Sequence, residues 1–430
     1  MFFSADALVR EDIAYLSIRP NFVRLMDKGA QVSRVHGIYP SVTYPAHATL
    51  LTGCYPGKHG VLTNTSFKTV DDGYYSWQTD FSLFKVEDLF AAAKRAGCTT
   101  ASVYWPTMGN NPNIDYLVNE YFFPLPEEEM LETFRKFGAN EATLEVIKEN
   151  EDRFHRKETP WKERVTKENS YEDFTNGCAC SLIRRYQPDF MVMHNCVVDA
   201  TRHNFGAFSD ELPRALDMLD DWLGEIIEAM EDAGVFENTD FIILSDHGQM
   251  RFTMEAHPNV LLKDAGFIQV NEAGEVVDWQ AFSLFDCSSS TVYLKDKNDR
   301  ELHDRVERCL RQAAESGKYG IEAVYTEEET RLRYHYYGDF SFVLEAASGY
   351  WHTQDWNGPV VQPYQHGLCG SHGYLPEKGP WPVFFGRGPS FKPGAVVPMA
   401  EMVDIAPTIA RVLKSDLPEA EGRCMTELLK

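Results

Sequence analysis

Five short apolar runs, most of them followed by polar or glycine residues, constrain the fold of this chain more than any other feature. They span residues 2–3, 100–105, 189–194, 240–244 and 382–386. Apolar runs of this length, without polar residues at alternate positions, are typical of strands that are buried on both faces. Helical patterns lie between them along the chain. Alternation of strand and helix predicts an α/β fold, a three-layer sandwich with a mostly parallel central sheet and helices on both faces.

Three segments carry the helical patterns, at residues 86–96, 212–230 and 402–413. In the second segment six apolar side chains recur at helical spacing and share one face, namely Leu216, Leu219, Leu223, Ile226, Ile227 and Met230. An apolar stripe of this kind predicts a helix that packs one side against the sheet.

Two stretches interrupt the alternation. Residues from about 120 to 180 are charged and predict a helical insert, whereas residues 255–365 mix strand-like and helical patterns. The second stretch predicts a smaller α+β insert that caps the site. We therefore expect a catalytic core made of residues 1–254 and 366–430, with the cap between its two parts.

Composition limits the class of partner. Of the 430 residues, 43% are hydrophobic and 13% aromatic, which indicates a folded globular protein. The net charge of −24 and the lack of basic stripes argue against a nucleic acid polymer as partner. A small phosphate ester remains compatible, because bound divalent cations make a site locally positive. No apolar run approaches the roughly 20 residues of a membrane span.

The cysteines and the first residues suggest a compartment. The nine cysteines are an odd count, and they show no paired spacing typical of a zinc site. Residues 1–6 lack the basic leader of a signal peptide. We therefore expect reduced thiols and a cytoplasmic protein. The sequence gives no indication of the oligomeric state.

Thr43 is the candidate nucleophile. Pro45 suits the first turn of a helix, where its missing N–H costs nothing, so Thr43 is predicted to lie at the helix N-terminus. The helix dipole and free N–H groups favour an anion there, and a metal-bound hydroxyl loses its proton readily. The alternative interpretation is a plain N-capping threonine.

Six further residues are candidate metal ligands. Asp199 and His203 are one helical turn apart, His372 lies between two glycines, and carboxylates follow two predicted strands; the full set is Asp6, Asp199, His203, Asp246, His247 and His372. Taken singly, each could be a capping or turn residue. Together they supply enough oxygen and nitrogen ligands for two divalent metals beside one hydroxyl, which is the equipment for displacement at phosphorus. The histidines at 47, 59, 194, 257 and 366 are interpreted as structural or supporting residues.

The order of these motifs resembles that of the alkaline phosphatase superfamily, and most closely its nucleotide pyrophosphatase/phosphodiesterase branch, the type I phosphodiesterases. The shared pattern is an early Asp, Thr-aromatic-Pro, Tyr-Pro-x-x-His-Gly with a later Asn, Asp-x-x-x-His, Asp-His-Gly and Gly-x-His-Gly. All appear here in that order, from Asp6 to the helix that ends near residue 413. The resemblance implies an alkaline-phosphatase-like fold.

The resemblance also implies residue roles. One zinc would be held by Asp199, His203 and His372, and the other by Asp6, Asp246 and His247 with the Thr43 hydroxyl. Manganese or iron could replace zinc in such mixed sites. Asn64 matches the asparagine that donates to a phosphoryl oxygen, Tyr44 the aromatic of the leaving-group or base pocket, and Trp105 a residue beside the substrate groove.

The implied activity is hydrolysis of a phosphodiester or pyrophosphate bond in a small, nucleotide-type molecule through a covalent phosphothreonine. Monoesterase relatives carry an added Lys and Arg, which the segment around Trp105 lacks, so diesters are favoured. The chain departs from the family pattern at Ala46-His47 and at residues 107–111, both near the expected groove. Phosphonate hydrolase, phosphomonoesterase and phosphomutase activity remain alternatives, as does a binding module with a decayed site.

Overall fold

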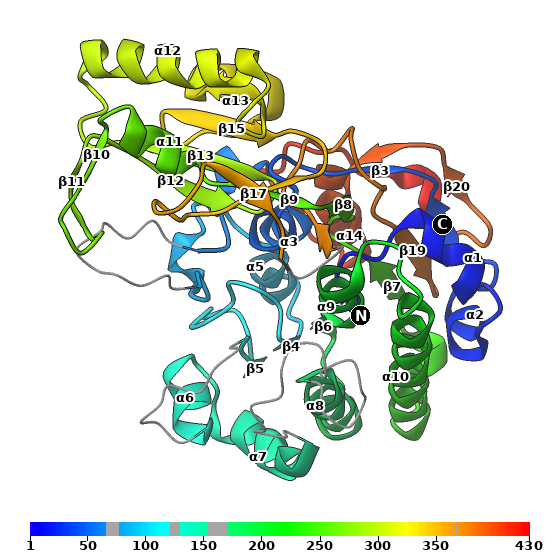
Figure 1. Cartoon of the computed structure of the whole chain (residues 1–430). Helices are drawn as coiled ribbons and strands as arrows, with labels where there is room; N and C mark the ends of the chain where they lie inside the picture. The colour runs from blue at the N-terminus through cyan, green and yellow to red at the C-terminus, as the bar shows by residue number, and fades with distance from the viewer. Residues whose placement is uncertain (66–76, 121–129, 154–170, 366–368) are drawn as a thin grey trace.

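The central element of the fold is an eight-stranded sheet. The computed structural model describes residues 1–65, 77–120, 130–153, 171–365 and 369–430. The strand order is β20-β2-β19-β7-β1-β6-β4-β5 (Figure 1). The strands are β1 (Phe2–Ala5), β2 (Ala30–Val32), β4 (Thr100–Val103), β5 (Tyr116–Val118), β6 (Phe190–Asn195), β7 (Phe241–Leu244), β19 (Phe384–Arg387) and β20 (Val396–Val397).

The sheet is mostly parallel, as predicted. β1 lies in its middle and pairs in parallel with β6 and with β7, and β4 pairs in parallel with β5 and β6. β19 is the exception, because it runs antiparallel to both β2 and β7. All five predicted strands belong to this sheet. The carboxyl ends of its parallel strands therefore meet at one edge, where open α/β sheets bind their ligands.

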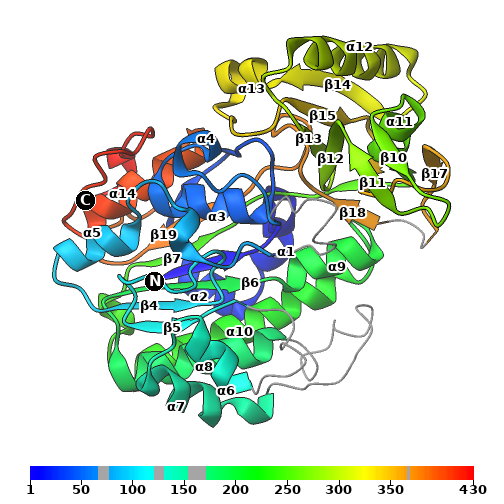
Figure 2. The ribbon, with the colours of Figure 1, turned by 90° about the vertical axis from the view of Figure 1, so that its left-hand side faces the viewer.

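Helices cover both faces of the sheet (Figure 2). Successive residues of a strand point to opposite faces, and accordingly Phe3 packs in one hydrophobic cluster and Phe2 in the other. The first cluster holds α2 (Pro20–Met26), α8 (Tyr171–Tyr186) and α10 (Leu212–Asp232). The second holds α3 (Thr43–Thr52), α5 (Leu89–Arg95) and α14 (Ile405–Val412). The predicted three-layer arrangement is confirmed.

The three predicted helices form with small shifts at their ends. α5 begins at Leu89 because the Asp88 side chain accepts a hydrogen bond from the Ala91 N–H at 2.8 Å, which caps the helix. α10 buries the predicted apolar stripe. The last segment opens with a 3₁₀ turn, Met402–Asp404, before α14 continues it.

A second, smaller layer lies within residues 255–365. Its antiparallel four-stranded sheet has the order β12-β13-β15-β14 and packs against α12 in a hydrophobic cluster of its own. The elements are β12 (Ala281–Asp286), β13 (Ser289–Leu294), β14 (Ile321–Thr326), β15 (Phe342–Ala346), α11 (Pro258–Asp264), α12 (Arg300–Ser316) and α13 (Glu327–Tyr334). Figure 2 shows this layer beside the end of the core that carries α9 (Val197–Phe205).

Short elements complete the described chain. β8 (Met250–Phe252) pairs with β18 (Cys369–Ser371), β9 (Met254–Ala256) pairs with β16 (Tyr350–His352) and β17 (Val361–Pro363), and β10 (Ile268–Val270) pairs with β11 (Val276–Trp279). The helical prediction at 120–180 corresponds to α6 (Met130–Lys136), α7 (Glu141–Glu149) and α8, while residues 121–129 and 154–170 lie outside the described residues. Within the described ranges, no helix has the length and apolar character needed to cross a membrane.

Candidate functional site

The candidate site forms where β1 and β7 end. These strands pair in parallel with Ser4 opposite Leu244, so the residues that follow them are neighbours. Asp6 comes one residue after β1, and Asp246 and His247 follow β7 by two and three residues. The Ala7 N–H donates to Oδ1 of Asp246 at 3.2 Å across this edge. The sheet therefore brings together residues 240 positions apart, as the strand pattern predicted.

Thr43 is the first residue of α3, as predicted from Pro45. Its hydroxyl oxygen lies 3.1 Å from Nε2 of His247, and the residue is 8% exposed. Val42 before it is extended and provides no side-chain cap. Instead, the Tyr44 N–H donates to Oδ1 of Asn64 at 2.8 Å. Asn64 thus caps the helix beside the Thr43 hydroxyl, which leaves its amide nitrogen as a donor for another group.

One group of candidate ligands is Asp199, His203 and His372, whose ligand atoms all lie within 4.8 Å of one another. Asp199 and His203 are one turn apart on α9, with Oδ1 and Nε2 separated by 3.4 Å. Nδ1 of His203 is 3.0 Å from the Gly370 carbonyl, and Nδ1 of His372 is 3.1 Å from a carbonyl of the loop before α3. Each Nδ1–H therefore donates to a carbonyl, which leaves Nε2 of both rings as a metal ligand.

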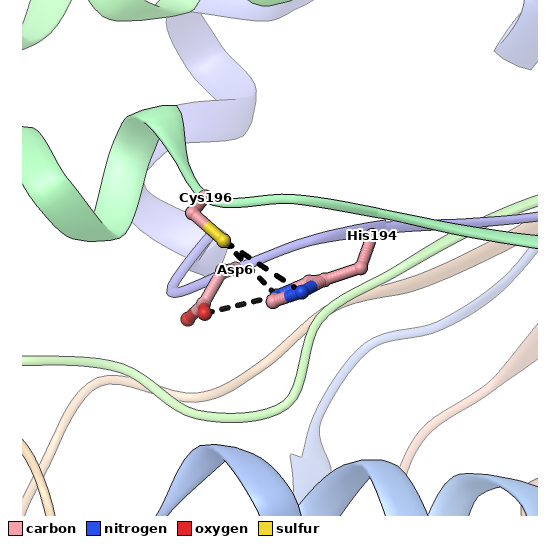
Figure 3. Close-up of side chains that lie close together, drawn as sticks. All are labelled: Asp6, His194 and Cys196. Atoms are coloured by element: carbon pink, nitrogen blue, oxygen red, sulfur yellow. Dashed lines mark hydrogen bonds and ion pairs between the residues drawn. The ribbon is translucent and has the colours of Figure 1, made fainter. Parts of the chain in front are cut away.

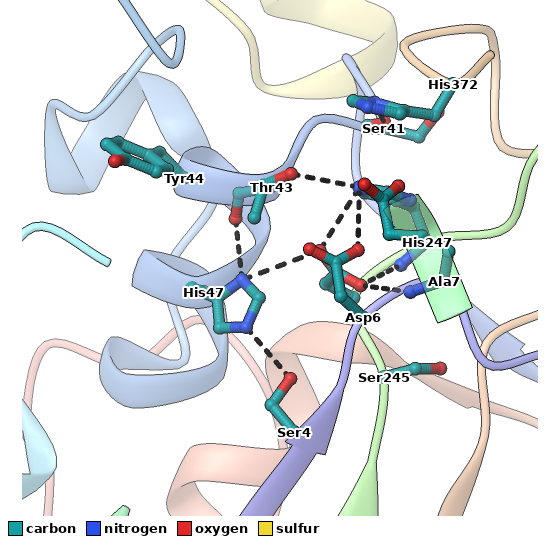
Figure 4. Close-up of polar contacts among 12 residues, drawn as sticks. Ser4, Asp6, Ala7, Ser41, Thr43, Tyr44, His47, Ser245, His247 and His372 are labelled. Atoms are coloured by element: carbon teal, nitrogen blue, oxygen red, sulfur yellow. Dashed lines mark hydrogen bonds and ion pairs between the residues drawn. The ribbon is translucent and has the colours of Figure 1, made fainter. Parts of the chain in front are cut away.

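The second group adjoins the first, and Figure 4 shows its Asp6 and His247 near His372 of the first group. Nε2 of His247 lies 3.2 Å from Oδ2 of Asp246 and 3.6 Å from Oδ1 of Asp6. The ligand atoms of Asp6, Asp199 and His247 also lie within 4.8 Å of one another, so Asp199 is close to both groups. Among the described residues, neither Oδ1 of Asp6 nor Oδ2 of Asp246 has a hydrogen-bond partner, although both atoms are buried.

Burial makes this cluster unfavourable without a cation. Burial, followed by the Asp199 charge, raises the pKa of Asp6 to about 7, and burial with the Asp6 charge raises the pKa of Asp246 well above its usual range. Burial is also the largest single influence on Asp199 and acts to raise its pKa, but the imidazoles of His203, His372 and His247 together outweigh it and hold that pKa below its usual range. Unpaired buried carboxylates are costly unless they are paired or coordinate metals. The orphaned oxygens and the mixed oxygen and nitrogen donor set fit divalent cations.

A chain of buried side chains supports Asp6 from behind. Nε2 of His194 lies 3.0 Å from Oδ2 of Asp6, and its Nδ1 lies 3.6 Å from Oε1 of Glu120. The other Glu120 oxygen accepts a hydrogen bond from the Tyr44 hydroxyl. The Cys196 thiol lies 3.6 Å from both ring nitrogens of His194 (Figure 3). This chain connects the Tyr44 wall of the cavity to a candidate metal ligand.

His47 and Trp105 lie behind the site. His47 is fully buried, with Nδ1 2.8 Å from the Thr43 carbonyl and Nε2 2.8 Å from the Ser4 hydroxyl. The Trp105 ring is 0% exposed and packs edge-on against His47, with ring centroids 4.7 Å apart. Trp105 is not among the residues that line the cavity. The indole is packed in the core behind the cavity, and a role of Trp105 beside the substrate groove stays a prediction.

A cavity of about 370 Å³ opens at the site. Thr43, Tyr44 and Asn64 line one side of it, and the hairpin between β12 and β13 contributes residues from the insert. Sequence reasoning missed several residues in this wall, among them Glu120, Cys196, Asp286 and Cys287. No motif marks them, since each reaches the cavity through the tertiary fold. The one sequence feature that could have identified any of them is the position of Cys196, three residues before the candidate ligand Asp199.

Fold and site together define the class of protein: a hydrolase with an alkaline-phosphatase-like fold and candidate metal-binding groups at the carboxyl edge of its sheet. The profile of the family described as type I phosphodiesterase / nucleotide pyrophosphatase matches residues 1–375. The chain belongs to this family and is a phosphodiesterase/nucleotide pyrophosphatase by family.

Individual relatives are distant in sequence and similar in fold. The human bis(5′-adenosyl)-triphosphatase ENPP4 is 22% identical over 96% of this chain and 76% of its own length. A venom phosphodiesterase of Macrovipera lebetinus is 21% identical over 93% of this chain and 41% of its own length. The solved structure of murine ENPP5 matches 100% of this chain and 99% of its own with a TM-score of 0.65 and 19% identity. At that identity the structural match concerns the fold.

Proposed function

We propose that this protein is a two-metal hydrolase that cleaves phosphodiester or pyrophosphate bonds of small, nucleotide-type molecules through a phosphothreonine at Thr43. The observation that carries the proposal is the Thr43 hydroxyl, 3.1 Å from His247 Nε2 at the N-terminus of α3 and on the wall of the cavity. The names of the relatives agree with it. One is a bis(5′-adenosyl)-triphosphatase, and an inactive threonine-to-alanine variant of murine ENPP5 was solved in complex with AMP.

Two groups of residues would hold the metals. Asp199, His203 and His372 form one set, and Asp6, Asp246 and His247 with the Thr43 hydroxyl form the other. Zinc suits these carboxylate and imidazole donors, and manganese or iron could replace it. Bound dications would neutralise the buried carboxylates, lower the pKa of the Thr43 hydroxyl and offset charge on the transferring phosphoryl group.

The chain's own residues would then carry out a two-step displacement. The Thr43 hydroxyl gives its proton to solvent and its oxygen attacks phosphorus. The bond from phosphorus to the leaving oxygen breaks, and the leaving group departs as an anion or takes up a proton from solvent. Water then attacks the same phosphorus, so that the bond to Thr43 breaks and the hydroxyl is restored. The amide nitrogen of Asn64 donates to a non-bridging oxygen, while the Tyr44 N–H holds the amide oxygen in place. The α3 N-terminus adds favourable dipole charge for an anion.

The cavity favours a diester over a monoester. Among the described residues that line it, none is a lysine or an arginine. A monoester brings an additional negative charge, which such a wall does not compensate. This lining argues against phosphomonoesterase and phosphomutase activity and in favour of a substrate with one negative charge at phosphorus.

The test compares bis-p-nitrophenyl phosphate with p-nitrophenyl phosphate as substrates of the zinc-loaded protein. We expect a preference for the diester and a loss of kcat of roughly 10³-fold or more in Thr43→Ala, as for removal of other nucleophiles. Thr43→Ser should retain part of the activity. Thr52→Ala, the same change at the far end of α3, should retain nearly all of it. A preference for the monoester, or full activity of Thr43→Ala, would overturn the proposal.

A further inference from the structure

Asp286 is a buried acid that the reaction described above does not use. It is the last residue of β12, is 4% exposed, and lines the same cavity as Thr43. Among the described residues, no group forms a hydrogen bond with its Oδ2. Burial raises the pKa of this carboxyl well above its usual range. A buried polar group without a partner is rare in folded proteins and calls for an explanation.

The backbone fixes Asp286 in this position. Cys287 and Ser288 join β12 to β13, and the Ser288 N–H donates to the carbonyl of His372 at 2.8 Å. A Cβ on Gly373 would lie 2.1 Å from the Asp286 carbonyl oxygen, so only glycine permits this approach. The hairpin tip of the insert is therefore docked against the loop that carries a candidate metal ligand. This docking places Asp286 in the wall of the cavity.

The hairpin tip also holds strained backbone. Cys287 has a φ of +63°, a left-handed conformation that costs a residue other than glycine about 1–2 kcal/mol. Its carbonyl accepts a hydrogen bond from the His352 N–H at 2.9 Å, which helps to hold this conformation. Backbone strain beside an unpartnered carboxyl concentrates two unfavourable features at one point. Such features persist mainly where function requires them.

The other acids of the cavity have partners, whereas Asp286 has no side-chain hydrogen-bond partner in the part of the chain that the structure describes. Glu120 accepts a hydrogen bond from Tyr44 and lies 3.6 Å from His194, while Asp6 and Asp199 belong to the candidate metal groups. No described lysine or arginine lines the cavity. A hydrogen-bond donor on a ligand in the cavity would therefore satisfy Asp286, and a positively charged donor would also compensate the carboxylate.

Aromatic side chains next to Asp286 suit a cation. Phe285 and Trp351 line the cavity, with ring centroids 6.2 Å apart. Aromatic faces attract ammonium groups, and more strongly when water is excluded. A charge-assisted hydrogen bond from an N–H donor to a buried carboxylate is stronger than one between neutral groups.

We propose that Asp286 is a specificity-determining residue that accepts a hydrogen bond from a protonated primary amino group of the substrate. The preferred substrates are then zwitterionic phosphodiesters in which one esterified part carries the ammonium group. This inference rests on the proposed function for the bond that is broken, and it adds the chemical class of the part that fills the cavity.

The test uses two esters with the same leaving group, 2-aminoethyl p-nitrophenyl phosphate and ethyl p-nitrophenyl phosphate. We expect the zinc-loaded protein to prefer the aminoethyl ester by roughly 10-fold to 100-fold in kcat/KM, mainly through KM, since a hydrogen bond to a charged group contributes about this much discrimination. Asp286→Leu should abolish the preference, and Asp286→Asn should reduce it. Asp339→Asn, at a side chain that is 90% exposed, is the matched control and should leave the preference unchanged.

A third ester, 2-(trimethylammonio)ethyl p-nitrophenyl phosphate, carries the charge without an N–H donor. If it is preferred as strongly as the aminoethyl ester, the hydrogen bond to Asp286 is not the determinant and the proposal fails. The proposal also fails if the wild-type protein does not discriminate between the first two esters, or if its preference survives in Asp286→Leu.

Binding separates this inference from the proposed function. Calorimetry on the zinc-loaded Thr43→Ala protein should give tighter binding of 2-aminoethyl phosphate than of ethyl phosphate, and Asp286→Leu in the same background should remove the difference. If the protein hydrolyses neither ester but still binds 2-aminoethyl phosphate more tightly, the proposed reaction is rejected and the role of Asp286 is supported. If the protein hydrolyses the esters but binds both phosphates equally, the reaction is supported and the role of Asp286 is rejected. Asp286→Leu should also raise Tm, because it removes an unpaired buried acid. If it unfolds the protein, Asp286→Asn gives the same comparison.

Discussion

The Thr43 hydroxyl lies 3.1 Å from Nε2 of His247, and 204 positions of sequence separate the two residues. One residue opens a helix near the start of the chain, and the other follows β7 in the middle of the sheet. Their contact exists only when the sheet and α3 are packed together. Nucleophile and candidate metal ligand are therefore assembled by folding, and any metal bound between them should stabilise the folded state.

Asn64 should serve both the helix and the reaction, and two substitutions separate these roles. Asn64→Asp keeps an oxygen acceptor for the Tyr44 N–H but removes the amide donor. Asn64→Ala removes both. We expect both variants to lose roughly 10²-fold to 10³-fold in kcat, as for removal of one oxyanion donor. Only Asn64→Ala should also lose about 1 kcal/mol of stability as a lost cap.

Diester hydrolysis and urea unfolding of the two variants provide the measurements. A variant Asn64→Asp with wild-type kcat would show that the amide donor has no part in the reaction. Equal stability of both variants would show that the hydrogen bond to Tyr44 is not a significant cap.

His194 should set the metal affinity through Asp6. Its Nε2 lies 3.0 Å from Oδ2 of Asp6, and such partners of metal ligands commonly contribute 10-fold to 100-fold in affinity. We therefore expect His194→Ala to weaken zinc binding by about that factor, measured by competition with a chelator. His36→Ala is the control, because that imidazole pairs with Glu401 at 2.7 Å away from the site. Unchanged zinc affinity in His194→Ala would contradict the supporting role.

The strand pattern predicted the core of the fold because its five short runs are apolar enough, and alternate regularly enough with helical patterns, to identify buried strands. The edge strands β5 and β20, and β2 next to β20, have two or three residues each and carry no usable pattern. The antiparallel direction of β19 likewise has no signature in its own residues. Direction and edge pairing depend on the path of the chain, which hydrophobic periodicity does not encode.

Part of the candidate site could likewise be predicted from the sequence, and part could not. The gathering of its candidate ligands could be predicted because carboxylates and imidazoles follow strands or share a helical turn, as at Asp246 and His203; their role as ligands stays a prediction. Asp286 could not, since its place in the cavity depends on how the hairpin of the insert docks against Gly373. Trp105 shows the converse, because a sequence motif predicts a residue type near the groove but not the direction in which the side chain points.

The docking of the hairpin can be tested at Gly373. This residue has a φ of +89°, and an added Cβ would lie 2.1 Å from the Asp286 carbonyl oxygen. Gly373→Ala therefore combines backbone strain with a steric clash, and we expect a loss of roughly 2–4 kcal/mol in stability and reduced diester hydrolysis.

Gly234→Ala is the matched control, with a φ of +70° and no atom within 4 Å of the added Cβ. It carries the backbone strain alone, so it should cost about 1 kcal/mol and leave hydrolysis intact. Equal losses of stability in the two variants would mean that the β12–β13 hairpin can shift away from the added Cβ without destabilising the fold.

Metal removal should change how stability depends on pH. In the metal-free protein, burial and Asp199 raise the pKa of Asp6 to about 7, from an unfolded value near 3.8. Between these values the folded protein keeps a proton that the unfolded chain has lost, so stability falls as pH rises from about 4 to 7. Zinc replaces that proton, because its ligands must be deprotonated, and its stabilising effect should therefore grow over the same range.

Thermal unfolding at pH 5 and pH 7, with a chelator and with excess zinc, gives the measurement. We expect the increase in Tm on adding zinc to be larger at pH 7 by roughly several degrees, following the linkage between ligand binding and stability. Asp6→Asn should reduce this pH dependence, since it removes the titrating carboxyl and one ligand together, whereas Asp339→Asn at the surface should not. An increase in Tm that is equal at both pH values would mean that Asp6 is ionised in the metal-free fold. Groups of the protein, and not a bound cation, would then stabilise the ionised carboxylates in the fold.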